Sequence, residues 1–190
     1  MSGARADVAV RAALAGDARA CARLGARLAR WHHAMDPRRF FVTPSLEEGY
    51  AWWLGKERRN PHAVVLAAVR KARGRERVVG YAYGRIEPRD WNTLRERCGV
   101  GIDLIVEPAY RGRGVGRILV DELVRRLGEK GAPRVVIQVA ARNGKAQGVF
   151  AGLGFRPTML EMTLEATGAR RGTAGSPPSR QRRAGSPSRR

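Results

Sequence analysis

A short run rich in glycine and arginine, YRGRGVGR at residues 110–117, limits the folds open to this chain more than any other segment. The apolar run VGIDLIV at residues 100–106 precedes it and predicts a buried strand. From Val115 onward, leucines recur at every fourth position and predict an amphipathic helix; they are Leu119, Leu123 and Leu127. The run is therefore a loop between a strand and a helix.

The segment after this helix predicts a second strand. Gly128, Gly131 and Pro133 are expected to end the helix. The apolar run RVVIQVA at residues 134–140 then predicts a strand. A strand, a helix and a strand within about 30 residues form a right-handed β-α-β unit with parallel strands. The glycine loop thus lies at the N-terminus of the crossover helix.

The position of the loop favours phosphate binding over the other use of such a composition, a disordered Arg-Gly segment that binds nucleic acid. At a helix N-terminus, unpaired N–H groups and the positive end of the helix dipole attract anions. Three glycines leave the backbone open to a ligand; they are Gly112, Gly114 and Gly116. A P-loop is excluded because no Gly-Lys-Ser/Thr follows, and a dinucleotide fingerprint because position 117 is Arg117.

Composition sets the broad class of the chain. Its 190 residues, 43% of them hydrophobic, are enough for one domain with its own core. The formal charge of +20 predicts attraction to polyanions, a class that includes nucleic acid, membrane surfaces and phosphorylated cofactors. No apolar stretch approaches the roughly 18 residues that span a bilayer, so we expect a soluble protein with no membrane partner. The Arg-rich N-terminus also lacks a signal-peptide core.

The few cysteines and histidines exclude two further classes of site. Cys21 and Cys98 are too few for a disulfide framework, which fits a reduced, cytoplasmic location. The three histidines are not spaced as zinc ligands, so no metal site is expected.

Residues 166–190 differ from the rest in composition. They contain seven arginines, no acid, no aromatic and no aliphatic residue larger than alanine. This predicts a disordered basic tail after a domain at residues 1–165. The tail is either a solvated appendage or a tether through which nucleic acid becomes a partner.

The N-terminal half predicts strands and helices in mixed order. A strand is expected at residues 7–14, followed by a helix that Asp17 caps and that runs to about His33. Ser45 begins a capping signature for a short second helix. Two strands at residues 63–69 and 77–86, joined by a turn near Gly74, predict an antiparallel pair.

Two motifs in the second half resemble the GNAT superfamily of acyl-CoA-dependent N-acyltransferases. The first matches the family pattern around the glycine loop at Val106, Pro108, Arg111, Gly114 and Gly116. The second matches the family pattern in register and differs in type at one of its five positions; these are Asn143, Ala146, Phe150, Gly154 and Phe155. The resemblance covers about residues 6–165 and excludes the tail.

The resemblance implies an α/β (α+β) GNAT fold, a central mixed β-sheet flanked by helices with a parallel β-α-β cofactor-binding unit. It also implies acetyl-CoA as acyl donor and direct attack by a primary amine, of a small molecule or a protein, in a ternary complex. By the same resemblance, the pantetheine amides contact the backbone of Leu104, Ile105 and Val106. The remaining cofactor-binding residues are Arg111, Gly112, Arg113, Gly114, Val115, Gly116, Arg117, Asn143 and Phe150.

Some of these assignments have a structural alternative. In a chain so rich in arginine, Arg111, Arg113 and Arg117 are equally explained as solvated surface residues. Asn143 opens a helix, where an asparagine also serves as a plain N-cap.

The chain departs from the family pattern at two positions that matter for proton transfer. Phe150 stands where the family often has a tyrosine that protonates the leaving thiolate. Gln138 stands where similar N-terminal amine acetyltransferases carry a glutamate base, which an amide cannot replace. Either other groups move the protons or catalysis is weak, because a positioned acid or base contributes about 10²- to 10⁴-fold.

Asp103, together with Gln138, is therefore a candidate catalytic residue. It lies three positions before Val106, where some small-amine acetyltransferases carry an acid that faces the substrate cleft. Such a carboxylate attracts an ammonium group or accepts its proton; the alternative is an ion pair with a nearby arginine.

Further acceptor-side candidates are Glu47, Glu48, His32 and His33, with Trp52 and Trp53 as pocket walls. The histidines are equally explained as helix-end residues, and the tryptophans as core residues.

Three classes of function follow. The first is an N-acetyltransferase, the second a catalytically silent acyl-CoA-binding module, and the third a basic nucleic-acid-associated protein. The sequence leaves the acceptor amine and the oligomeric state open.

Overall fold

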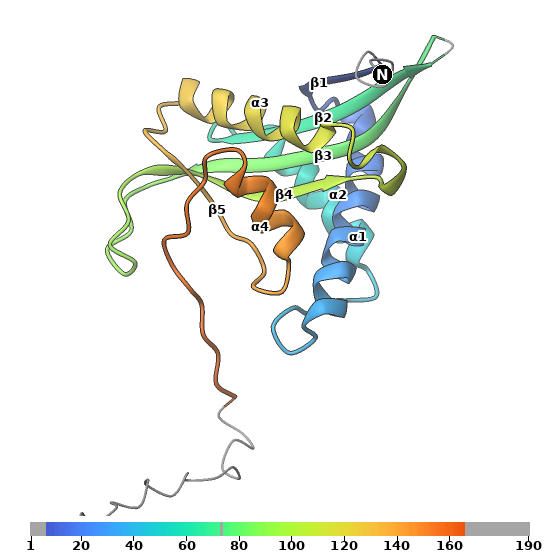
Figure 1. Ribbon diagram of the computed structural model, residues 1–190. Helices are drawn as coiled ribbons and strands as arrows, with labels where there is room; N and C mark the ends of the chain where they lie inside the picture. Colours follow the sequence, from blue (N-terminus) through green and yellow to red (C-terminus); the bar gives the residue numbers. More distant parts are fainter. Residues whose placement is uncertain (1–6, 73, 166–190) are drawn as a thin grey trace, which may run out of the picture. The chain divides into compact units, whose positions relative to one another are not determined.

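The computed structural model describes residues 7–72 and 74–165 (Figure 1). The chain divides into a unit Met1–Phe155, which contains the described helices and strands, and a unit Arg156–Arg190. The division predicted at residue 165 stays a prediction, because residues 166–190 lie outside the described residues. None of the helices described is long and apolar enough to cross a membrane.

The centre of the first unit is a five-stranded mixed sheet in the order β1-β2-β3-β4-β5. Its strands are β1 (Val8–Ala12), β2 (Ala63–Ala72), β3 (Arg75–Glu87), β4 (Cys98–Val106) and β5 (Val135–Ile137). The first four are antiparallel to their neighbours, and β4 and β5 are parallel. Gly74, with φ of +73°, makes the turn between β2 and β3. The predicted mixed sheet and its β-α-β unit, β4-α3-β5, are confirmed.

Helices cover both faces of this sheet (Figure 1). One face packs against α3 (Val115–Glu129), whose Leu119, Leu123 and Leu127 are almost fully buried. The other face packs against α1 (Ala18–Met35) and α2 (Leu46–Glu57). Because side chains alternate across a strand, Tyr81 and Tyr83 of β3 both enter the α1/α2 side of the core.

The helix starts agree with the sequence predictions, but the predicted side-chain caps differ. Asp17 precedes α1, yet its carboxylate accepts a hydrogen bond from the Leu14 N–H at 2.7 Å and pairs with Arg11. Ser45 precedes α2 without a capping hydrogen bond from its side chain. The helix α1 extends to Met35, two residues beyond the predicted end.

The strand predicted at residues 134–140 is shorter, because β5 ends at Ile137. Pairing between β4 and β5 stops at Gly101, and in the β3–β4 register Ile102 has no partner between Gly101 and Asp103. An extra residue of this kind bends a strand and strengthens its twist. The last part of β4, from Ile102 to Val106, therefore continues beside β3 alone, and its other edge is open.

Candidate active site

The glycine loop lies between the open end of β4 and the N-terminus of α3. The short 3₁₀ turn η2 (Pro108–Tyr110) leads into it, and Gly114 is the N-cap of α3. Gly112 and Gly114 have φ of +71° and +81°, a conformation that other residues adopt at a cost. A Cβ on Gly116 would have its nearest neighbour, a methyl of Val106, at 3.9 Å. The backbone of the first turn is thus open to an anion.

The three arginines of the loop have different environments. Arg111 Nε donates a hydrogen bond to the carbonyl oxygen of Val106 at 2.9 Å, which fixes the loop to the end of β4. Arg113 is exposed and lies over the Tyr110 ring, 5.8 Å from its centroid. Arg117 is exposed and lies 3.7 Å from Asp121. All three arginines are exposed, but only Arg111 ties the loop to β4 by a hydrogen bond.

The apolar residues predicted to bind the cofactor place their side chains in the core. Ile105 and Val106 are buried on opposite faces of the sheet, and Leu104 and Val115 pack in the cluster under α3. A ligand at this edge therefore meets their backbone groups, as the resemblance implies for pantetheine amides.

The second motif forms the start and interior of α4 (Gly144–Ala151). The buried Asn143 caps the helix, its Oδ1 accepting a hydrogen bond from the Ala146 N–H at 3.1 Å. Phe150 is buried and lies edge-on to Phe155, with ring centroids 5.7 Å apart. Gln138 follows β5 directly and is exposed.

Asp103 is held by a tyrosine. The hydroxyl of the fully buried Tyr81 donates a hydrogen bond to the Asp103 carboxylate. Burial raises the pKa of Asp103 from its ordinary 3.8 to about 6, and the hydrogen bond from Tyr81 partly opposes that rise. Within the described part of the chain no arginine forms an ion pair with Asp103, so the alternative of an arginine partner is not what the structure shows.

Gly25 of α1 brings a second tyrosine to this pair. A Cβ on Gly25 would lie 2.4 Å from Cδ1 of Tyr50 and 2.8 Å from the Tyr81 hydroxyl, so both tyrosines touch the helix backbone here. Burial and the nearby charge of Asp103 raise the pKa of Tyr50. Asp103, Tyr81 and Tyr50 thus form one contiguous group, which we call the Asp103 cluster.

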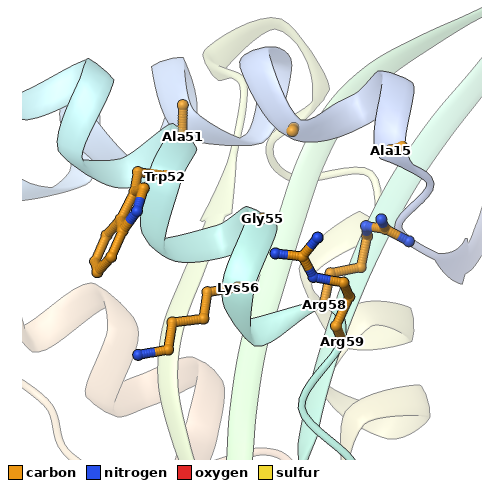
Figure 2. A pocket seen from close by; sticks show the side chains of 8 residues that line it. Ala15, Ala51, Trp52, Gly55, Lys56, Arg58 and Arg59 are labelled. Atoms are coloured by element: carbon orange, nitrogen blue, oxygen red, sulfur yellow. The ribbon is translucent and has the colours of Figure 1, made fainter.

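A pocket of about 320 Å³ opens beside this cluster. Its lining residues are Thr43, Ser45, Leu46, Gly49, Tyr50 and Trp53. Trp53 lies edge-on to Tyr50, with centroids 5.7 Å apart. The other tryptophan of the pair, Trp52, is 71% exposed and lines a different, larger hollow of about 480 Å³ on the outer side of α1 and α2 (Figure 2).

The two histidines contact the loop before α2 and are not among the residues that line the pocket. The His32 ring stacks on Phe40 with centroids 5.0 Å apart, and burial lowers the pKa of His32. His33 Nδ1 lies 2.6 Å from the Phe40 carbonyl oxygen. Glu47 and Glu48 lie in the first turn of α2 and are also outside the lining.

The sequence indicates Asp103 as a site residue but not its partners Tyr81 and Tyr50. Tyr81 and Tyr83 are two residues apart in a strand, so the pattern YAY predicts that they share a face. Nothing in the local sequence shows that α1 crosses this face at Gly25 or that Tyr50 meets it there.

Comparison with known proteins identifies the family. A family model described as Acetyltransferase (GNAT) family matches residues 26–155. The chain belongs to the GNAT acetyltransferase family. Acetyltransferases of this family use acetyl-CoA as acyl donor, which agrees with the cofactor predicted from the sequence.

Proteins named mycothiol acetyltransferase are similar to part of the chain. It is 34% identical over 103 residues to a mycothiol acetyltransferase from Nocardioides sp., and 32% identical over 94 residues to one from Nocardia farcinica. Each match spans 50% of this chain and about a third of the relative, 34% and 30% respectively.

Solved structures share the GNAT fold. The tetramutant of the BH1408 protein from Bacillus halodurans superimposes with a TM-score of 0.69 at 20% identity, over 83% of this chain and 99% of the other. A protein from Clostridium acetobutylicum described as a predicted acetyltransferase, solved with acetyl-CoA, superimposes with a TM-score of 0.62 at 16% identity, over 83% of this chain and 96% of the other.

Proposed function

We propose that this GNAT enzyme transfers the acetyl group of acetyl-CoA directly to a small primary amine, with Asp103 accepting the ammonium proton. The observation that carries the proposal is the Asp103 cluster. Its carboxylate has a pKa near 6 and accepts a hydrogen bond from Tyr81, and its third member, Tyr50, lines an aromatic pocket. Asp103 lies three residues before the end of β4, where the strand edge opens toward the glycine loop.

The cofactor side of the proposal rests on backbone groups. The unpaired edge of β4 offers amide and carbonyl groups to pantetheine, and the first turn of α3 offers N–H groups to the pyrophosphate. Arg113 and Arg117 add positive charge near the loop, and Asn143 and Phe150 complete the site from α4.

The reaction requires three proton movements. The ammonium group loses a proton to Asp103, and the nitrogen lone pair attacks the thioester carbon. The nitrogen then loses a second proton to water as the C–S bond breaks and releases the CoA thiolate, which takes up the third. A pKa near 6 leaves Asp103 ionised at pH 7 and more basic than an ordinary aspartate. Phe150 has no proton to give the thiolate, so water supplies it, and Gln138, an amide, takes no part as a base.

The size and lining of the pocket support a small acceptor. Its volume of about 320 Å³ is at the lower end of ligand sites, and its aromatic walls suit an amine with an apolar or cationic body. The acceptor of the mycothiol acetyltransferases is one member of the panel to test. Cys21 and Cys98 are buried and unpaired, which supports a reducing, cytoplasmic location.

The pH dependence of kcat/KM tests the role of Asp103. An acceptor whose ammonium pKa is above 9 binds wild type in its charged form, so kcat/KM should rise through pH 6 and then level off. Asp103→Asn uses only the free amine, so its much lower kcat/KM should rise about tenfold per pH unit between pH 7 and 8. The affinity for acetyl-CoA is the control and should stay unchanged. Identical profiles for both proteins would remove Asp103 from the mechanism.

A further inference from the structure

The outer surface of α1 and α2 carries a concentration of positive charge that acetyl transfer does not use. On α1, four exposed arginines recur at intervals of four, four and three residues and form one stripe along the helix; they are Arg19, Arg23, Arg27 and Arg30. Lys56, Arg58 and Arg59 lie at the C-terminal end of α2. We call these seven residues the α1/α2 basic face.

The arginines of the stripe are not neutralised by acidic side chains, unlike arginines of the other long helix, α3. The 18 residues of α1 include no aspartate or glutamate, and none of the ion pairs in the described chain involves these four arginines. On α3, by contrast, Arg125 and Arg126 both pair with Glu122, at 2.8 Å and 2.6 Å. Like charges one turn apart destabilise a helix, so the unpaired stripe works against folding and is suited to a polyanionic ligand.

A hollow lies where α1 begins and α2 ends, and Ala18, the residue before Arg19, is part of its lining. It has a volume of about 480 Å³, and Figure 2 shows Trp52 and Lys56 projecting from α2 with Arg58 and Arg59 beyond them. The Trp52 ring is 71% exposed, and Lys56 Nζ lies 5.5 Å from its centroid. Gly55 also lines the hollow, and a Cβ at this position would have no heavy atom within 4 Å.

Two of the acids nearest in sequence to the hollow are occupied elsewhere, whereas Glu48 is exposed and lies one helical turn before Trp52. Glu57 is buried and accepts hydrogen bonds from the Tyr83 hydroxyl at 2.7 Å and from Asn60 at 3.1 Å. Asp17 pairs with Arg11 at 2.6 Å. Glu57 and Asp17 therefore do not neutralise Lys56, Arg58 and Arg59.

We propose that the α1/α2 basic face binds single-stranded nucleic acid, with phosphates on the arginines and an unpaired base stacked on Trp52. Guanidinium groups bind phosphate in a bidentate manner, and an exposed aromatic ring among cations is a stacking platform for a base. A membrane surface is disfavoured because the exposed side of α1 carries arginines in place of apolar residues. An acidic protein would use the charges and leave the tryptophan hollow without a role.

The salt dependence of binding separates this face from general charge attraction. The probe is a fluorescent 20-nucleotide oligo(dT), and every variant retains the full chain. The stripe variant combines Arg19→Gln, Arg23→Gln and Arg27→Gln. The matched control removes three cations that pair with glutamates elsewhere, through Lys71→Gln, Arg89→Gln and Arg125→Gln.

Losing three phosphate contacts should weaken binding and flatten the plot of log K against log salt by about 2. The control has the same net charge and should keep the slope of wild type. Equal changes in both variants, or no binding by wild type at low salt, would overturn the proposal. Unchanged acetyl-CoA affinity shows that each variant is folded.

The hollow is tested by a second pair of variants. Gly55→Ala adds a methyl group to open space and should leave oligo(dT) binding unchanged, whereas Gly55→Glu places a carboxylate among the cations and should abolish it. Trp52→Ala should cost about fivefold or more in affinity, the lower limit for loss of one stacked base. Full affinity in Trp52→Ala, or competition by polyglutamate as strong as that by unlabelled oligo(dT), would show an unspecific anionic surface and refute base stacking.

Discussion

Asp103 links the proposed chemistry to the stability of the protein. Its pKa of about 6 in the folded state lies above the ordinary 3.8, so its contribution to stability is full below pH 4 and is lost as pH rises through 6. Asp103→Asn does not titrate and keeps an acceptor for the Tyr81 hydroxyl. The variant should therefore gain stability relative to wild type between pH 4 and 8, by at most about 3 kcal/mol. Urea unfolding at both pH values measures this, and a difference independent of pH would contradict it.

Phe150 is the second residue whose chemistry is open to test. Phe150→Tyr adds a phenol at the family's usual position for protonating the thiolate, and kcat on a working amine should rise toward the roughly 100-fold that a positioned acid contributes. Its neighbour Phe155 lies edge-on, so the ring plane is held in place. Steady-state kinetics with acetyl-CoA affinity as control decide the matter. An unchanged kcat would mean that protonation of the thiolate does not limit turnover.

At the scale of elements, the loop before α3 carries the cofactor assignment. Gly114→Glu puts bulk, negative charge and an unfavourable φ of +81° where the pyrophosphate is expected, so acetyl-CoA affinity should fall more than about 100-fold, or 2.7 kcal/mol. Gly74→Glu is the matched control: it has a φ of +73° and the same added charge, but lies in the β2–β3 turn. Calorimetry measures both, and wild-type affinity in Gly114→Glu would refute the assignment.

The crossing of α1 over the Asp103 cluster gives a second prediction at this scale. Gly25→Ala forces a methyl group within 2.4 Å of Tyr50 and 2.8 Å of the Tyr81 hydroxyl. We expect a loss of about 1–3 kcal/mol in the free energy of unfolding and a lower kcat/KM for the amine, with acetyl-CoA affinity retained. Gly55→Ala, a helical glycine with open space around it, should be neutral or stabilising. Wild-type amine kinetics in Gly25→Ala would show that the cluster tolerates displacement.

The sequence predicts the helices and strands better than the tertiary contacts between them. The strand, loop and helix around Gly114 follow from local periodicity and from glycines that have their own backbone preference. The early end of β5 does not follow from local periodicity, because it depends on the unpaired Ile102 in the neighbouring strand β4. The Asp103 cluster unites residues of α2, β3 and β4 beside Gly25 of α1, and such long-range packing has no periodic signature in the chain.

For the whole molecule, much of the positive charge lies outside the groups that acetyl transfer uses. The formal charge of +20 includes arginines at the cofactor loop and arginines along α1 that acetyl transfer does not need. Binding of acetyl-CoA alone would not establish acetyl transfer, because a silent binding module with the same loop would also bind acetyl-CoA.

The most direct test of the central claim is release of the CoA thiol by the purified full chain over a panel of small primary amines. With saturating acetyl-CoA, we predict that at least one amine accelerates thiol release above hydrolysis and gives one N-acetylated product by mass spectrometry. Asp103→Asn should lower kcat/KM for that amine by about 100-fold. Tight acetyl-CoA binding with no amine-dependent thiol release across the panel would contradict the proposed transfer reaction.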